Sequence, residues 1–454
     1  MNASPTSSAA AATSAEGARR TNVRYWILLL IFIVTTVNYA DRATLSITGP
    51  AMREEFGFSA VQMGYIFSAF SWAYVMAQIP GGWLLDRFGA RRIYAASIFV
   101  WSFFTLLQGW LGVFATIGSA MTVLFALRFA VGLAESPAFP ANAKVVASWF
   151  PTAERGTASA IFNAAQYFAA VVFTPLMAWV VHSWGWHHVY LWMGLMGMAL
   201  ALVWLKIMRS PATHPAVNGA ELAHIEQGGG LIHMNEGAGQ GSEKAPAGWF
   251  YAKQLLSNRM LAGVYLGQYC INVLTYFFLT WFPVYLVQAR GMSILKAGFV
   301  ASLPAICGFL GGVLGGVISD SLLRKGYSLT FARKLPIVVG MLLSVSMIAC
   351  NYVDAEWLVV GIMALAFFGK GIGALGWAVV ADTAPKEVMG LAGSIFNTFG
   401  NIAGIVTPIV IGYILSVTGS FNGALVFVGI NALVTVVSYL VIVKDIRRVE
   451  LKHA

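Results

Sequence analysis

The sequence predicts an all-α membrane protein whose twelve transmembrane helices form two six-helix bundles related by pseudo-two-fold symmetry. Of its 454 residues, 58% are hydrophobic and only 10% are charged, a composition outside the range of soluble globular domains. Its apolar runs are about twenty residues long, as bilayer-crossing helices require, and lack the period-two alternation of barrel strands. Six runs precede one long polar segment and six follow it, which divides the chain into halves.

The apolar runs define the predicted spans. In chain order they cover residues 25–48, 60–84, 93–115, 119–141, 156–182, 188–208, 259–287, 295–319, 334–352, 356–381, 390–416 and 423–443. The N-terminal bundle is therefore expected over residues 25–208 and the C-terminal bundle over residues 259–443.

Polar segments flank both bundles. Residues 1–24 are expected to form a disordered cytoplasmic tail, and residues 444–454 a second cytoplasmic tail. Residues 209–258 form a cytoplasmic linker, in which Asn218 is placed to cap a short helix. The Gly-containing run 236–248 is expected to be flexible.

The distribution of Lys and Arg sets the expected orientation. With both termini in the cytoplasm, 22 of the 28 Lys and Arg residues lie on cytoplasmic segments, and only Arg53, Arg290 and Lys296 lie outside. This bias agrees with the positive-inside rule. It also explains the net charge of +10, so we infer no nucleic-acid partner.

The sequence predicts neither an enzyme nor a metal site. Cys270, Cys307 and Cys350 lie in apolar runs without metal-ligand spacing, and we interpret them as packing residues. The seven histidines lack such spacing too, and the glycine run 228–230 is not followed by the Lys and Ser/Thr of a phosphate-binding loop. We therefore expect no cofactor and no use of ATP.

The two halves repeat each other at a constant offset of 234 residues. The repeated blocks are Gly81, Gly82, Asp86 and Arg91 with Gly315, Gly316, Asp320 and Lys325; Pro151 and Gly156 with Pro385 and Gly390; and residues 161–163 with residues 395–397. Three separated blocks at one offset indicate a duplicated six-helix unit. Parallel repeats of this kind place a substrate site near the membrane midplane between the halves.

A known family shares several of these segments. Residues 82–92, with Gly82, Asp86, Arg87 and Arg91, resemble the signature between spans two and three of the major facilitator superfamily. Residues 38–43, 67–74, 78–83, 268–320 and 367–377 are similar to the anion:cation symporter branch, and the resemblance is closest to bacterial D-glucarate/D-galactarate transporters. The resemblance implies proton-coupled uptake of a sugar diacid across the bacterial inner membrane.

The first predicted span contains an ionisable cluster, Tyr39, Asp41 and Arg42. A charge at membrane depth costs about 2.5–3.5 kcal/mol on insertion scales, so the cluster indicates function. In one interpretation Asp41 carries a coupling proton and Arg42 binds a substrate carboxylate; in the other the two neutralise each other and fix packing. Neighbouring helical residues point about 100° apart, so we expect each to have a different partner.

Arg128 and Glu135 lie seven residues apart on one face of the fourth predicted span. The resemblance implies that they belong to the charged centre of a carrier, with Glu135 as a second proton carrier. Arg128 would then neutralise Glu135 or bind substrate. The alternative is a structural salt bridge between spans one and four.

Lys370, in the tenth predicted span, is the third intramembrane base. A sugar diacid has a carboxylate at each end. Lys370 in the C-terminal half would bind one carboxylate, and Arg42 or Arg128 in the N-terminal half would bind the other. Alternatively, Lys370 snorkels to the membrane interface.

Neutral side chains are expected to complete the binding cavity. The assigned residues are Gln166 in span five, Gln268, Asn272 and Tyr276 in span seven, Asn397 in span eleven, and the aromatic residues Tyr39, Tyr74 and Trp377. Asn163 and Asn401 are weaker candidates. The alternative is that the amides join helices and the aromatic rings only pack.

Charged residues at the cytoplasmic ends of spans two and eight are expected to form a gate, which holds the bundles together when the carrier opens outward. The gate residues are Gly82, Asp86, Arg87, Arg91 and Asp320. For Arg92 and Arg324 we expect an orientation signal only.

Together these assignments predict a proton-coupled symporter that works by alternating access. Protons bind Asp41 and Glu135, the dianion enters between Arg42, Arg128 and Lys370, and the loaded carrier turns inward. Its expected partners are a sugar-acid anion and the lipid bilayer, and its functional unit is a monomer. An uncoupled facilitator, a sodium symporter, a membrane sensor, and a carrier of galactonate, hexuronate or phosphate remain as alternatives.

Overall fold

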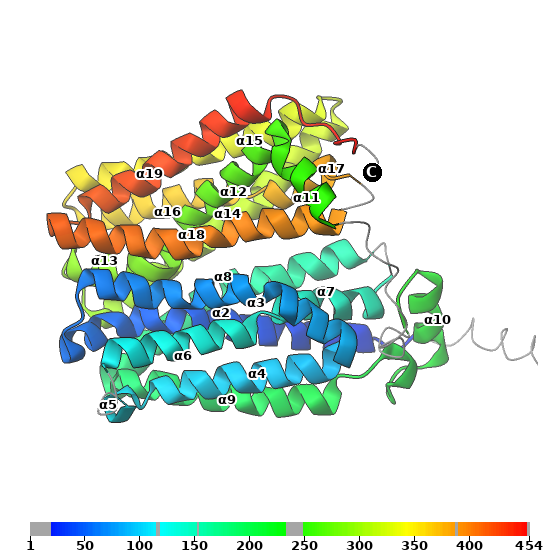
Figure 1. Cartoon of the computed structure of the whole chain (residues 1–454), viewed down its shortest axis with the longest axis horizontal. Coiled ribbons are helices and arrows are strands. Elements are labelled where there is room, and N and C mark those ends of the chain that lie inside the picture. The colour runs from blue at the N-terminus through cyan, green and yellow to red at the C-terminus, as the bar shows by residue number, and fades with distance from the viewer. Residues whose placement is uncertain (1–19, 115–118, 152–153, 233–247, 386–388, 452–454) are drawn as a thin grey trace, which may run out of the picture.

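The computed structural model shows two helical bundles side by side, one from each half of the chain (Figure 1). It describes residues 20–114, 119–151, 154–232, 248–385 and 389–451. Residues 1–19 of the predicted tail and residues 236–247 of the flexible run therefore lie outside the described residues, whereas α2 begins at Val23, within the predicted tail.

The membrane spans follow the predicted order. The N-terminal bundle contains α2 (Val23–Phe56), α3 (Ala60–Phe88), α4 (Ala90–Gln108), α6 (Ala120–Glu135) with α7 (Ala138–Trp149), α8 (Arg155–Trp184) and α9 (Trp186–Ile207). The C-terminal bundle contains α12 (Arg259–Tyr276) with η2 (Phe277–Trp281) and α13 (Phe282–Gln288), α14 (Ile294–Arg324), α15 (Leu329–Ser344) with η3 (Val345–Tyr352), α16 (Glu356–Ile372) with α17 (Gly376–Thr383), α18 (Met389–Thr418), and α19 (Asn422–Val437) with η5 (Ser438–Val443).

Ten helical segments of the described chain are long and apolar enough to cross a membrane, and α3 and α4 complete the twelve spans. The all-helical fold predicted from the sequence is confirmed. Caps define several helix boundaries: Ser59 and Gln62 form a capping box at the start of α3, and Gly57, with a φ of 69°, ends α2.

Four shorter helices complete the description: α5 (Leu111–Phe114), η1 (Pro211–Thr213), α10 (Gly219–Gln227) and α11 (Gly248–Ser257). The predicted cap of α10 is present, because Asn218 Oδ1 accepts a hydrogen bond from the Glu221 amide over 2.9 Å. The linker was not expected to contain α11. That helix packs against α12, and its Leu255 is fully buried.

Spans four and ten were predicted as continuous helices, but both are broken. The fourth breaks at Ser136 and Pro137, where proline cannot donate a backbone hydrogen bond, and the tenth breaks between Ile372 and Gly376. At the 234-residue offset the first break corresponds to residues 370–371, just before the second break, so the two breaks fall at similar but not identical positions in the two halves. The duplicated unit thus repeats an irregularity of its backbone as well as its sequence.

Contacts between the bundles follow the internal repeat. The second span, α3, packs on the eleventh, α18, and the fifth span, α8, packs on the eighth, α14. A repeat that relates spans two and five to spans eight and eleven exchanges these two contacts. The packing therefore has the pseudo-two-fold symmetry predicted from the sequence.

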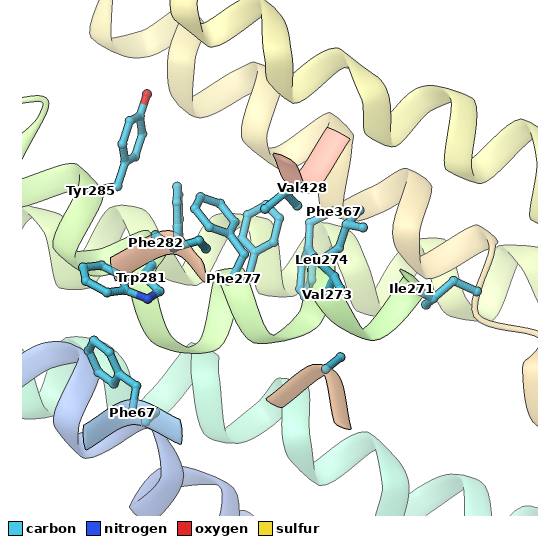
Figure 2. Packing of buried hydrophobic residues seen from close by; sticks show 14 of the residues in the cluster. Phe67, Ile271, Val273, Leu274, Phe277, Trp281, Phe282, Tyr285, Phe367 and Val428 are labelled. Carbon is cyan, nitrogen blue, oxygen red and sulfur yellow. The ribbon is translucent and has the colours of Figure 1, made fainter. Parts of the chain in front are cut away.

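The bundles are joined away from the linker. We call the end with α10 and α11 the linker end and the opposite end the far end (Figure 1). Phe67 packs against Trp281 across the bundles, with ring centroids 5.3 Å apart (Figure 2).

Hydrogen bonds between the bundles likewise lie toward the far end. They join Arg53 to Gln288 at 2.7 Å, Tyr65 to Tyr413 at 3.3 Å, and Ser302 to the carbonyl of Val171 at 3.4 Å. No hydrogen bond or ion pair between described residues joins the bundles at the linker end.

Candidate functional site

Two neighbouring spans bring four charged side chains together in the N-terminal bundle. Helix α2 supplies Asp41 and Arg42, and α6 supplies Arg128 and Glu135. Both carboxylates are completely buried, and Arg128 is 3% exposed. Sequestered charges of this kind require partners within the protein.

Arg42 pairs with Glu135 and not with its neighbour Asp41. Its Nε donates to Glu135 Oε2 over 2.9 Å. Three aromatic rings surround the guanidinium: the centroids of Tyr39, Phe70 and Tyr74 lie 4.9, 4.6 and 5.0 Å from Arg42 Cζ. These ring faces favour a cation, and they hold it beside Glu135.

Asp41 faces a different helix. Thr105 of α4 donates its hydroxyl hydrogen to Asp41 Oδ2 over 3.2 Å, whereas Oδ1 has no hydrogen-bond partner in the described structure. The separate partners of Asp41 and Arg42 match the expectation from helix geometry. Sequence analysis missed Thr105, because no charge or motif distinguishes it from other hydroxyl residues in apolar runs.

Arg128 bonds to the backbone of α2. Its Nη1 and Nη2 donate to the carbonyl oxygens of Asp41 and Arg42 over 3.3 and 3.4 Å. No ion pair between Arg128 and Glu135 is present among the described residues. The ring of Phe70, 5.9 Å from Arg128 Cζ, lies near both guanidinium groups, and sequence analysis also missed this residue.

Lys370, near the end of α16, is a buried cation without an anionic partner. The residue is 5% exposed, and its Nζ lies 5.1 Å from the ring centroid of Phe367. Within the described part of the chain it makes no hydrogen bond or ion pair. This burial is unlike a lysine that snorkels to the membrane interface.

The predicted neutral residues form two short networks. In one, Gln268 Nε2 donates to Asn272 Oδ1 over 3.4 Å. In the other, Tyr276 donates to Asn401 Oδ1 over 3.0 Å, and Asn401 Nδ2 donates to Asn397 Oδ1 over 3.2 Å. The second network joins α12 to α18 through Asn401, a contact of the kind expected if the amides join helices.

The remaining predicted site residues lie apart from the charged cluster or only border it. Gln166 donates to the carbonyl of Asn163 on its own helix over 3.1 Å. Trp377 is 56% exposed and meets Phe396 edge to face at 4.9 Å. Tyr74, by contrast, is buried against Arg42.

Two of the predicted gate residues, Arg91 and Asp320, contact their own bundles in this conformation. Arg91 Nη2 donates to the carbonyl of Leu205 over 2.6 Å, and Asp320 lies 3.4 Å from Arg333 Nη1. Arg333 also bonds to Asp382 over 2.8 Å. Gly82 has open space beside its Cα, and the side chain of Asp86 lies outside the described structure.

Sequence comparisons place the chain among transporters. Residues 31–332 match the model of the Major Facilitator Superfamily. The protein named Probable galactarate/D-glucarate transporter in Bacillus subtilis is 66% identical over 434 residues, covering 96% of this chain and 95% of the relative. Its namesake in Escherichia coli is 62% identical over 442 residues, covering 97% and 98%. A D-galactonate transporter of Escherichia coli is 40% identical over 428 residues, covering 94% and 97%.

Solved structures share the fold at low sequence identity. A bacterial homologue of the lysosomal transporter Spinster, in an inward-facing and occupied conformation, has a TM-score of 0.73 at 15% identity and covers 93% of this chain and 97% of its own. A D-xylose-proton symporter has a TM-score of 0.70 at 15% identity and covers 92% and 97%.

Proposed function

The chain belongs to the major facilitator superfamily, and from this premise we propose that it is a proton-coupled symporter that imports a sugar diacid, D-glucarate or D-galactarate. Relatives 57–66% identical to it over nearly their full lengths carry the name Probable galactarate/D-glucarate transporter. We propose transport without enzymatic activity, cofactor or ATP. The coupling ion is the proton.

The coupling mechanism that we propose rests on the Arg42–Glu135 ion pair. Both side chains are buried within the membrane, and they are 2.9 Å apart. Protonation of Glu135 removes the negative charge that holds Arg42, so the guanidinium becomes available to a substrate carboxylate. Loss of the substrate reverses this exchange. Proton and anion thus bind in the same half-cycle, which is what symport requires.

Asp41 is the second proton carrier in this proposal. It is buried on another face of α2, where Thr105 orients one carboxylate oxygen and leaves the other without a partner. Arg128 contacts the α2 backbone at both Asp41 and Arg42. A change in charge at Asp41 is therefore transmitted to Arg42 through the helix that carries both residues.

Lys370 supplies the second anchor for a dianion. A buried ammonium group without an anionic partner is costly, and a carboxylate from the substrate offsets that cost. Arg42 in the N-terminal bundle and Lys370 in the C-terminal bundle would bind opposite ends of the diacid. Gln268, Asn272 and Asn397 would bind hydroxyls between them.

The proposed stoichiometry is two protons for each dianion. This combination moves no net charge, so the pH gradient drives uptake; a third proton would add about 2.3 kcal/mol per 100 mV of membrane potential. We place the protein in the inner membrane with both termini in the cytoplasm. It functions as a monomer, since one chain contains both bundles and the site between them.

Substrate competition tests this proposal. Uptake of labelled glucarate is measured at two external pH values with galactarate, galactonate, glucuronate and phosphate as competitors. We expect acid-stimulated, uncoupler-sensitive and sodium-independent uptake that galactarate blocks best. Uptake that resists an uncoupler would indicate a facilitator, a sodium requirement would indicate a sodium symporter, and binding without flux would indicate a sensor. The 40% identical D-galactonate transporter makes galactonate the leading alternative substrate.

A further inference from the structure

A cationic cavity lies at the linker end of the N-terminal bundle, outside the charged cluster within the membrane. It has a volume of about 620 Å³ and is formed by the turn between α3 and α4 and by the start of the linker. Its polar side chains are four arginines and two hydroxyl residues: Arg87, Arg91, Arg92, Arg209, Ser210 and Thr213. None of the described residues that line it is acidic.

Buried tryptophans fix the backbone on both sides of this cavity. Trp204 Nε1 donates to the carbonyl of Arg91 over 3.1 Å, and Trp149 Nε1 donates to the carbonyl of Arg209 over 3.2 Å. The two tryptophans are 0% and 1% exposed. The backbones of Arg91 and Arg209 are therefore positioned by the core of the bundle.

A second cavity at the linker end differs from the first, because its lining contains both basic and acidic side chains. It lies beside η5 in the C-terminal bundle and is lined by Arg259, Lys444, Arg447 and Arg448 together with the acidic residues Asp445 and Glu450. The acidic residues offset its positive charge. Of these two cavities, the one in the N-terminal bundle has four guanidinium groups and no carboxylate among its described lining residues.

Exposed apolar side chains lead from the cationic cavity along α9. Leu202 is 66% exposed, Leu205 is 40% exposed and Ile207 is 40% exposed, just before Arg209. In a membrane protein such a face contacts lipid chains. A ligand that matches the whole region has an anionic phosphate group for the arginines and hydrocarbon chains for α9.

We propose that this cavity binds the phosphodiester group of an anionic phospholipid such as phosphatidylglycerol, with the acyl chains along α9. Guanidinium groups bind phosphate oxygens in bidentate geometry. A choline or ethanolamine headgroup would bring its own cation next to the four arginines. The cavity therefore discriminates against zwitterionic lipids, and Arg92 and Arg209 act as lipid ligands.

Short-chain lipids test this site on the full chain purified in detergent. Phosphatidylglycerol, phosphatidylcholine with the same acyl chains, and inorganic phosphate are titrated separately, and binding is measured by thermal shift and by native mass spectrometry. We expect phosphatidylglycerol to bind preferentially. The double variant Arg92→Gln/Arg209→Gln is expected to lower its affinity about tenfold, since each basic residue contributes on the order of a few-fold.

Two further variants keep the test decisive. Thr213→Glu adds a carboxylate to the cavity while retaining every arginine, and it should also weaken phosphatidylglycerol binding. This variant serves as the test if the double variant fails to fold. Arg447→Gln, in the cavity of mixed charge, is the matched control and should bind as the unmodified chain does. Equal binding of phosphatidylcholine, or undiminished phosphatidylglycerol binding by Thr213→Glu, overturns the proposal. Stabilisation by inorganic phosphate alone to the same extent would indicate a soluble anion and exclude a lipid site.

Discussion

Arg42 and Glu135 form an ion pair at membrane depth, and each keeps one unused hydrogen-bonding atom. Nε of Arg42 lies 2.9 Å from Oε2 of Glu135, while Nη2 of Arg42 and Oε1 of Glu135 are buried without hydrogen-bond partners in the described structure. The pair is therefore incomplete as a purely structural salt bridge. Its unused donor suits a carboxylate, and its unused acceptor suits a proton.

Glu135→Gln separates coupling from substrate exchange. The amide keeps the side-chain size but cannot carry the coupling proton, so we expect proton-driven accumulation of labelled glucarate to be lost. Counterflow between preloaded proteoliposomes should continue, because it needs no net proton movement. The control is Glu356→Gln, which removes a half-exposed carboxylate that pairs with Lys296 at 2.6 Å. Normal accumulation by Glu135→Gln would remove this residue from the coupling mechanism.

Thr105 is predicted to position Asp41 through one hydrogen bond of 3.2 Å. Thr105→Val removes the hydroxyl while preserving the branched shape, and we expect several-fold slower proton-driven uptake. Thr105→Ser retains the hydroxyl and should restore most of the rate. Initial rates measured across a range of external pH distinguish the two, because a packing defect would lower both variants equally at every pH.

Lys370 is predicted to determine the preference for a diacid. Lys370→Asn removes the cation, so the affinity for glucarate should fall more than the affinity for galactonate, which has one carboxylate. A charge-assisted hydrogen bond contributes roughly 1.5–3 kcal/mol, so the expected difference is about tenfold or more. Lys370→Arg should retain part of the preference. Equal losses for both substrates in competition assays would contradict the two-ended binding mode.

The sequence predicted the fold more completely than the contacts within the site. Apolar run length and the 234-residue offset predict twelve spans and a duplicated unit, because both depend on local composition and order. The 100° angle between consecutive helical residues also predicts separate partners for Asp41 and Arg42. The identity of a partner depends on which helices pack together. Thr105 and Phe70 come from spans three and two, and neither has a local signature that marks it.

The linker also contains a contact that the sequence alone does not predict. Asn218 follows the general rule for helix caps and is predictable, whereas Glu221 looks like an ordinary polar residue in the sequence. In the structure Glu221 is fully buried and receives hydrogen bonds from residues at the start of α2. Only the packing of α10 on the N-terminal bundle gives that carboxylate its role.

Glu221→Ala is therefore expected to destabilise the protein. Its carboxylate accepts hydrogen bonds from the Thr21 hydroxyl at 2.6 Å and from the amides of Val23 and Arg24 at 3.1 Å. These amides are otherwise unsatisfied at a helix N-terminus, so their loss should cost about 1–3 kcal/mol. Thermal unfolding in detergent measures the effect. Glu226→Ala, an exposed position on the same helix, is the control and should leave the unfolding temperature unchanged.

Gly340→Ala should disturb the close backbone contact between α15 and α16 beside Lys370. A Cβ at Gly340 would collide with the carbonyl oxygen of Gly369, and a Cβ at Gly369 would collide with that of Gly340, so α15 and α16 touch through their backbones. Gly369 directly precedes Lys370, so a shift of the α16 backbone that relieves the collision would also move Lys370. We expect a loss of about 1–3 kcal/mol in unfolding free energy, together with weaker glucarate binding. Gly361→Ala, on α16 but with open space around its Cα, should change neither quantity. Thermal unfolding and binding measured on both variants test the idea, and equal stability of the two would show that this contact tolerates a side chain.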